Sequence, residues 1–159
     1  MFLKNYTSAA TVTNTIARIE AVLIRCGVTG ITKEYGPNAV IAAVLFEIPH
    51  DGKYFTIRIP ADVEQALDAL WNDYCEKNPI EGRRRKKRGH FADQAARTAW
   101  KLAQDWIEVE MSRLQLKQST DPIETFLSYI WDNRKRQTFF QVVKESGYRA
   151  LLPERSEAA

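Results

Sequence analysis

The sequence is poor in the residues that most often build metal and catalytic centres. Its 159 residues include two histidines and two cysteines. His50 is expected in a hairpin turn, and His90 lies beside a basic run. Neither histidine is accompanied by another kind of metal-ligating residue at the spacing of a metal-binding motif. Cys26 and Cys75 lie far apart in sequence, which favours two free thiols in a reducing compartment over a disulfide. We therefore expect no metal and no cofactor.

Motifs of the common enzyme classes are missing as well. The chain has no GxSxG nucleophile turn, no phosphate-binding GxxxxGK or GxGxxG loop and no zinc-binding HExxH pair. Asp105, Glu108 and Glu110 lie close together on a predicted helix. Carboxylates at that spacing are usually solvated or paired with Lys or Arg rather than used for acid–base chemistry. We therefore expect no catalytic residue and favour a binding protein over an enzyme.

Long apolar runs are also lacking. No stretch approaches the roughly 18 apolar residues that a membrane span requires. The first ten residues, MFLKNYTSAA, lack the sustained apolar segment of a signal peptide. Hydrophobic residues still make up 45% of the chain, which is enough to build a core. We expect a single cytoplasmic domain, 1–159, without membrane contact.

The patterns that are present predict an α+β fold. Apolar residues at helical spacing predict an N-terminal helix over 11–26, closed by Gly27. Three β-rich segments within 29–59, with the turn pair Asp51 and Gly52, predict a three-stranded antiparallel β-meander. The C-terminal half is predicted to be helical, with helices at 62–77, 91–117, 122–132 and 139–146.

Two details of these helices can be predicted. Asp62, Asp121 and Thr138 are expected as N-caps, the first and third with a glutamine three residues on as a capping-box partner. The helix at 91–117 has two adjacent apolar rows, one of which ends at Val109, so it is expected to be central with partners on two sides. Its consistent polar face is predicted to comprise Arg97, Lys101, Gln104, Glu108 and Gln115.

Positive charge is concentrated in one place. The net charge is +3, and removing the six adjacent cations of 83–88 changes it to −3. They lie in a predicted loop, 78–90, just before the long helix, whose first amide groups can receive an anion. One interpretation is a solvated loop without a role. The other is a nucleic-acid or anion site formed by Arg83, Arg84, Arg85, Lys86, Lys87, Arg88 and His90.

A second, shorter cluster is Arg134, Lys135 and Arg136. Aromatic residues flank it, namely Tyr129, Trp131, Phe139 and Phe140. Cations interleaved with aromatics can bind phosphate and stack bases. Their positions within amphipathic helices favour instead aromatics in the core and cations on a loop. A separate ligand pocket could draw on the polar faces of the return strand and the long helix, through Arg58, Arg97, Trp100 and Trp131.

Several segments together resemble a widespread group of small bacteriophage and prophage proteins: KNYTS, KEYGPNAVIAAVLFEIP, RTAWKLAQDWIEVEMSRLQL, FLSYIWD and TFFQVVKESGYRALLP. The part RTAWKL…DW, 97–106, is the most specific. The resemblance implies an accessory protein made in a bacterial cytoplasm, often an anti-CRISPR-like inhibitor of host defence that acts by binding.

The resemblance suits two kinds of partner. In the first interpretation the basic loop contacts nucleic acid or a host defence complex that handles nucleic acid. In the alternative the protein is a sponge that sequesters cyclic-nucleotide or ADP-ribose-type signals. The sponge would need an Arg and aromatic pocket, formed between the subunits of a possible homodimer. The four Trp residues of so small a chain make a homodimer plausible.

Overall fold

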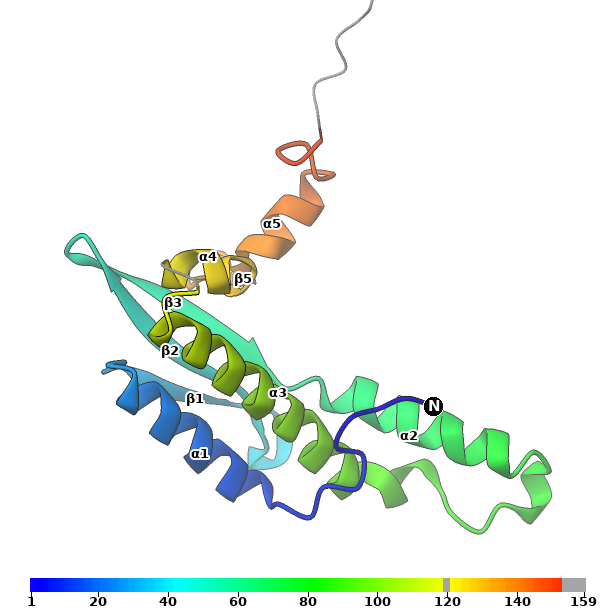
Figure 1. Cartoon of the computed structure of the whole chain (residues 1–159). Coiled ribbons are helices and arrows are strands. Elements are labelled where there is room, and N and C mark those ends of the chain that lie inside the picture. Colours follow the sequence, from blue (N-terminus) through cyan, green and yellow to red (C-terminus); the bar gives the residue numbers. More distant parts are fainter. Residues whose placement is uncertain (119–120, 153–159) are drawn as a thin grey trace, which may run out of the picture.

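The computed structural model describes residues 1–118 and 121–152, and it has the α+β architecture that the sequence predicts (Figure 1). The helices are α1 (Val12–Arg25), α2 (Val63–Lys77), α3 (Ala92–Gln115), α4 (Pro122–Phe126) and α5 (Phe139–Glu145). The strands are β1 (Ile31–Tyr35), β2 (Ile41–His50), β3 (Lys53–Pro60), β4 (Trp131–Asp132) and β5 (Gln137–Thr138). Short 3-10 helices are η1 (Pro37–Ala39), η2 (Glu81–Arg83), η3 (Arg88–Phe91) and η4 (Leu127–Tyr129).

Strands β1, β2 and β3 form the predicted antiparallel meander, in that order. The β2–β3 turn consists of Asp51 and Gly52, whose φ angles of 47° and 73° suit the two-residue hairpins that match strand twist. Pairing of Val44 with Ile59 and of Phe46 with Ile57 places apolar side chains on one face of the sheet. The core packs against this face of the sheet.

Helices α1 and α3 lie side by side over that face of the sheet (Figure 1). The core joins apolar residues from α1, the sheet, α3 and α4, and Trp100 of α3 is completely buried in it. Helix α2 packs on the first half of α3 instead, through Leu67 and Leu70 against Ala95 and Ala99. The long helix is therefore central, with partners on two sides, as predicted.

The faces predicted for α3 are wrong at one polar and one apolar position. Gln104 is 2% exposed and donates to Glu108 Oε1 at 2.6 Å, whereas Val109 is 56% exposed. The buried face changes along the helix, because its first half packs on α2 and its second half on α1 and the sheet. The apolar row that starts at Ala95 therefore reaches solvent at Val109, beyond the end of the α2 contact.

The expected cap at Asp62 is also wrong. Its carboxylate makes no capping hydrogen bond, and its backbone lies at φ −80° and ψ 61°. The Val63 N–H donates to the Ala61 carbonyl at 2.8 Å, so Asp62 is the central residue of an inverse γ-turn. An N-cap normally needs extended backbone, which this turn does not allow. Asp121 and Thr138 do cap their helices, and Thr138 forms a complete capping box with Gln141.

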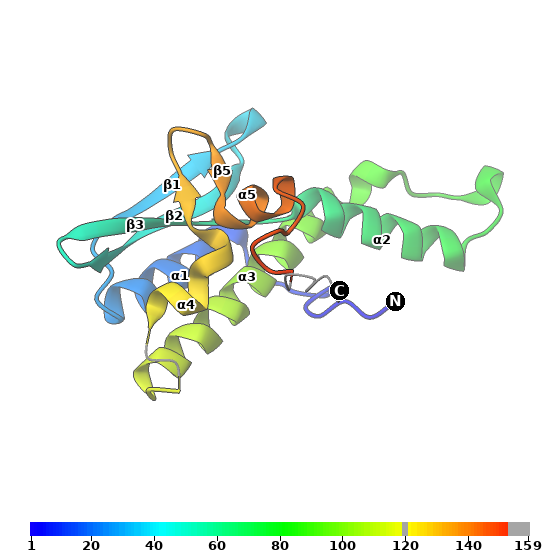
Figure 2. The ribbon, with the colours of Figure 1, turned by 90° about the horizontal axis from the view of Figure 1, so that it is seen from above.

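The helix predicted over 122–132 ends early. Helix α4 stops at Phe126, and Trp131 and Asp132 form strand β4, which pairs with β5. Two contacts favour this structure: Ile130 bridges to Ile57 on β3, and the Asp132 carboxylate accepts the next backbone N–H groups of the turn. The β4–β5 hairpin lies over the second face of the sheet (Figure 2). Helix α5 follows within the predicted range 139–146.

No helix in 1–118 or 121–152 combines the length and the apolar character needed to cross a membrane. In the same residues Cys26 and Cys75 are free thiols, in agreement with the sequence.

Candidate nucleic-acid interface

The basic run lies on a projection that we call the arm, defined as α2 together with residues 78–91. In both views the arm extends past the end of the sheet, and the chain after α2 returns along that helix before α3 begins (Figures 1 and 2). This return segment contains η2 and η3, with four residues of non-helical backbone between them. The arm thus presents its cations away from the main core.

Hydrogen bonds fix the return segment to Tyr74 of α2 and to its own first residue, Asn78. The hydroxyl of Tyr74 accepts the N–H groups of Arg85 and Lys86 at 3.1 and 3.2 Å. The Nε of Arg84 donates to the carbonyl of Asn78 at 2.9 Å. Repulsion among six like charges favours an extended loop, and these bonds give the loop one defined course along the helix.

An aromatic cluster lies beneath the cations. Trp71, Tyr74 and Phe91 have ring centroids 5.4 to 6.3 Å apart. The guanidinium of Arg84 lies 5.9 Å from the Trp71 ring and the Nζ of Lys86 lies 5.6 Å from the Phe91 ring, both within cation–π range. Helical spacing alone predicts that Trp71 and Tyr74 belong to the apolar stripe of α2. Their proximity to a cationic run was the signal of a second role.

Arg88 attaches the loop to the start of α2. It donates to Glu64 Oε2 at 2.8 Å and to Asp68 Oδ1 at 2.6 Å. Two carboxylates therefore neutralise this cation. His90 is exposed at the same end of the run, with its ring edge-on to Phe91 at a centroid distance of 5.4 Å.

The contacts alternate along the run. Every second side chain makes a contact within the arm: Arg84 with Trp71 and Arg88 with Glu64 and Asp68 of α2, and Lys86 with Phe91. The intervening side chains are exposed, and with the residues of 1–118 and 121–152 they make no ion pair or hydrogen bond: Arg83, Arg85 and Lys87. The alternation divides one basic run into three anchoring cations and three that are available to a ligand.

The first turn of α3 differs from the sequence expectation. Helix η3 leads directly into α3, and Phe91 at the junction has helical backbone and makes no side-chain cap. The N–H of Ala92 already donates to the carbonyl of Gly89. Part of the amide array expected to receive an anion is therefore used by η3, so the positive charge of the arm comes from its side chains.

The second basic cluster lies elsewhere, in the β4–β5 turn over the sheet (Figure 2). Arg134, Lys135 and Arg136 are all exposed. Backbone N–H groups of Lys135 and Arg134 donate to the Asp132 carboxylate, at 3.1 and 2.8 Å, and lower its pKa. The nearby Phe139 is 42% exposed. The structure separates this cluster from the arm rather than joining the two into one surface.

The four residues of the alternative pocket do not come together. Arg58 lies 4.9 Å from the Trp131 ring, but it also makes two hydrogen bonds to Glu34, at 2.7 and 3.1 Å, which lower the pKa of that carboxyl group. Trp100 is completely buried in the core, so it cannot line an open pocket. Arg97 instead donates to Gln94 Oε1 on its own helix at 3.0 Å.

These features define an α+β protein with a basic arm that is backed by aromatic rings and lies outside the main core. No protein-family model, curated protein or solved structure matches the chain. Within the described ranges, no three His, Cys, Asp or Glu side chains gather where they could hold a metal ion.

Proposed function

We propose that the protein is a non-enzymatic binding protein that acts in a bacterial cytoplasm against host defence, as the likeness to phage proteins implies, and that its arm binds nucleic acid. The observation that carries this proposal is the alternation of the basic run. The side chains of Arg83, Arg85 and Lys87 make no ion pair or hydrogen bond in the described part of the chain, while those of Arg84, Lys86 and Arg88 make contacts within the arm.

Nucleic acid suits this arrangement for an electrostatic reason. Each phosphate that a Lys or Arg neutralises releases condensed counterions, which gives affinity without sequence preference. The loop is already ordered by Tyr74, so less conformational entropy is lost on binding than in a free basic tail.

The spacing of the free cations also suits a strand of phosphates. Arg84 and Lys87 have extended backbone, in which residues two apart are separated by roughly 6–7 Å. Successive phosphates along a nucleic-acid strand repeat at a similar distance. In this proposal Arg85 and Lys87, which lie between or at these extended positions, contact neighbouring phosphates, and Arg83 extends the row toward η2.

The test compares two triple variants that remove the same charge. One is Arg83→Gln, Arg85→Gln, Lys87→Gln in the arm, and the other is Arg134→Gln, Lys135→Gln, Arg136→Gln in the hairpin. Fluorescence anisotropy is measured with labelled single-stranded and duplex oligonucleotides over a salt series. The arm variant should lose about tenfold or more in affinity, and its log–log salt slope should fall by about 2, because three phosphate contacts are lost.

The hairpin variant has the same net charge, so it controls for general attraction. Equal losses in both variants would show that affinity follows net charge and that the arm is not the site. A wild-type protein that binds no oligonucleotide but retains a host protein through the arm would replace nucleic acid with a protein partner.

The signal sponge is tested separately, because the stacking of Arg58 on Trp131 is the feature that favours it. A thermal-shift screen with cyclic dinucleotides and ADP-ribose is suitable, since a tight ligand stabilises the fold by mass action. A stabilisation that Trp131→Ala abolishes and the arm variant retains would favour the sponge over nucleic-acid binding.

A further inference from the structure

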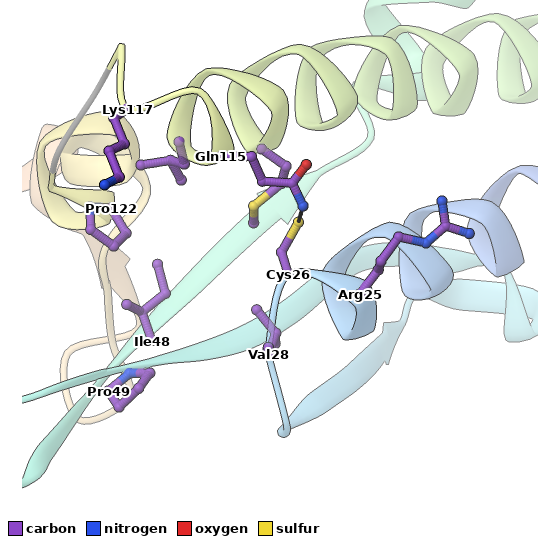
Figure 3. A pocket seen from close by; sticks show the side chains of 11 residues that line it. Arg25, Cys26, Val28, Ile48, Pro49, Gln115, Lys117 and Pro122 are labelled. Atoms are coloured by element: carbon purple, nitrogen blue, oxygen red, sulfur yellow. Dashed lines mark hydrogen bonds between the residues drawn. The ribbon is translucent and has the colours of Figure 1, made fainter.

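A second candidate site lies where α1 and α3 end side by side. A pocket of about 620 Å³ opens between these helix ends, the β2 end of the sheet and the start of α4 (Figure 3). This volume is in the range of small-molecule sites. Its apolar lining includes Val28, Ile48, Met111 and Leu114. Nothing in the proposed role of the arm uses this pocket.

Two matching helix ends build its walls. At the end of α1, the N–H of Gly27 donates to the Ile24 carbonyl and that of Val28 to the Leu23 carbonyl, both at 3.0 Å. This pair of bonds is the Schellman motif, which closes a helix with one residue in the left-handed region. That residue is Gly27, with φ 88°.

Helix α3 ends in the same motif but with a different residue in the key position. The N–H of Lys117 donates to the Leu114 carbonyl at 3.1 Å and that of Gln118 to the Arg113 carbonyl at 2.9 Å. Lys117 has φ 55°, in the region where glycine is the least strained residue. The ends of α1 and α5 place Gly27 and Gly147 there. A lysine at this site accepts backbone strain that a glycine would avoid, and its side chain borders the pocket.

The side chain of Lys117 borders the pocket. It lies beside Pro122 at one end, with Arg25 toward the other end, while Gln115 and Cys26 lie between them (Figure 3). Gln115 Nε2 donates to Cys26 Sγ at 3.4 Å and so joins the two helix ends. Among the described residues that line the pocket, none is acidic. Neither Lys117 nor Arg25 has an ion-pair partner in residues 1–118 and 121–152.

A cation near a helix C-terminus also offsets the helix dipole. That effect explains a positive charge at the ends of α1 and α3, and Lys144 shows the same placement in α5. It does not explain why α3 has its cation at the position of the motif that glycine occupies in α1 and α5. The apolar lining and the unpaired ammonium together provide a second explanation.

We propose that this pocket binds a small amphipathic anion. Its carboxylate or similar head pairs with the ammonium of Lys117, and its apolar body covers Val28, Ile48 and Met111. The two kinds of contact are those of most small-molecule sites, an apolar cavity with a few polar groups that set orientation. The ligand class is a short acyl or aryl carboxylate.

The experiment uses the full chain and three probes of equal length: octanoate, 1-octanol and octylammonium. Amide NMR shifts locate each probe, and titration gives its affinity. Octanoate should shift the amides of Val28, Cys26 and Lys117 and bind roughly tenfold more tightly than 1-octanol, because of the charge-assisted contact. Equal binding of octylammonium, or shifts confined to other surfaces, would overturn the proposal.

Variants at Lys117 separate binding from folding. Lys117→Gly relieves the left-handed backbone, so its melting temperature should equal or exceed that of the wild type, yet octanoate affinity should fall roughly tenfold. Lys144→Gln, which removes a cation from the last turn of α5, should bind octanoate normally. If Lys117→Gly binds octanoate as the wild type does, the lysine is not the anion partner.

The two free thiols give a further readout. Cys26 lines the pocket and Cys75 lies on α2. Octanoate should slow the alkylation of Cys26 by iodoacetamide and leave the alkylation rate of Cys75 unchanged. Equal protection of both thiols, or of neither, would contradict binding in this pocket. The arm variant should retain full octanoate binding, so the outcome does not depend on the proposed function of the arm.

Discussion

Asp105 attaches the first residues of the chain to α3. Its carboxylate accepts hydrogen bonds from Lys4 Nζ at 2.7 Å, Lys101 Nζ at 2.8 Å and Asn5 Nδ2 at 3.1 Å. Burial alone would raise the pKa of Asp105, but the three donors outweigh it and hold that pKa well below its usual range. Pairing with lysine is one of the two environments that the sequence predicted for this carboxylate. The contact with the N-terminal segment was not predictable from helical spacing.

Replacing Asp105 with Asn should lower the free energy of unfolding by about 1–2 kcal/mol at pH 7, because charged donors lose an ionised acceptor. A carboxyl group with a lowered folded-state pKa stabilises the protein above its unfolded pKa of about 4. The advantage of the wild type should therefore shrink as the pH falls through and below that value. Urea unfolding of both proteins at several pH values measures this difference in unfolding free energy.

Glu145→Gln is the matched control, since Glu145 is exposed and lacks a partner in the described residues. It should change the unfolding free energy little at any pH. A pH-independent loss in Asp105→Asn would mean that packing, and not the charge of the carboxylate, explains the effect.

At the scale of elements, one hydroxyl group fixes part of the return segment to α2. Tyr74→Phe removes the acceptor for the N–H groups of Arg85 and Lys86 but leaves the aromatic cluster intact. Hydrogen exchange at those two amides should speed up, while the global free energy of unfolding changes by less than about 1 kcal/mol. Tyr54→Phe, at an exposed tyrosine of β3, should change neither the exchange rate of those two amides nor the free energy of unfolding. Unchanged exchange in Tyr74→Phe would show that the loop is ordered by other contacts.

Two helix starts with similar sequence signals should respond differently to truncation. Thr11 caps α1, with its hydroxyl accepting from the Asn14 N–H at 3.2 Å, whereas Asp62 makes no capping bond to α2. Thr11→Ala should cost about 1 kcal/mol in urea unfolding. Asp62→Ala should cost a few tenths, since only its favourable charge near the helix start is lost. A larger cost for Asp62→Ala would contradict the γ-turn geometry.

Periodicity predicted most elements because α1, α2 and α3 each have apolar residues at helical spacing, and the strands alternate. It did not predict the change of buried face along α3, because that depends on where α2 ends and only the tertiary structure sets this. Periodicity also predicted a helix over 122–132, which is longer than the observed α4. The pairing of Ile130 with Ile57 is a long-range contact, and no local pattern encodes it.

At the scale of the molecule, the two clusters of positive charge lie outside the main hydrophobic core. Trypsin should cut first in the two exposed basic turns, after Arg83, Arg85 or Lys87 and within 134–136, because these sites are exposed and lie outside the α-helices. Bound oligonucleotide should protect the arm sites and leave the hairpin sites open. Timed digestion with mass spectrometry measures both rates, and equal protection of the two turns would contradict arm-specific binding.

A chain cut in the arm should remain assembled, because α2 and the sheet precede the cut and α3 follows it. Size-exclusion chromatography should then show one peak that contains both fragments. The fold class, the location of the charge and both basic clusters were predictable from sequence at this scale. The homodimer stays a prediction. The exposed apolar side chains near the C-terminal end, such as Phe140 at 48% and Leu151 at 70%, are consistent with it.

The alternation of the basic run has a consequence for how such a segment can evolve. In a disordered basic tail, only the number of cations counts, so gaining or losing one of them changes affinity gradually. Here the even positions contact Trp71, Phe91 and Glu64 within the arm, whereas the side chains at the odd positions make no ion pair or hydrogen bond with the described residues. Deleting a single residue between Arg83 and Arg88 would exchange the two sets and place the wrong side chains against Trp71 and Glu64. This segment should therefore tolerate Lys–Arg exchange at its odd positions more readily than any change in its length.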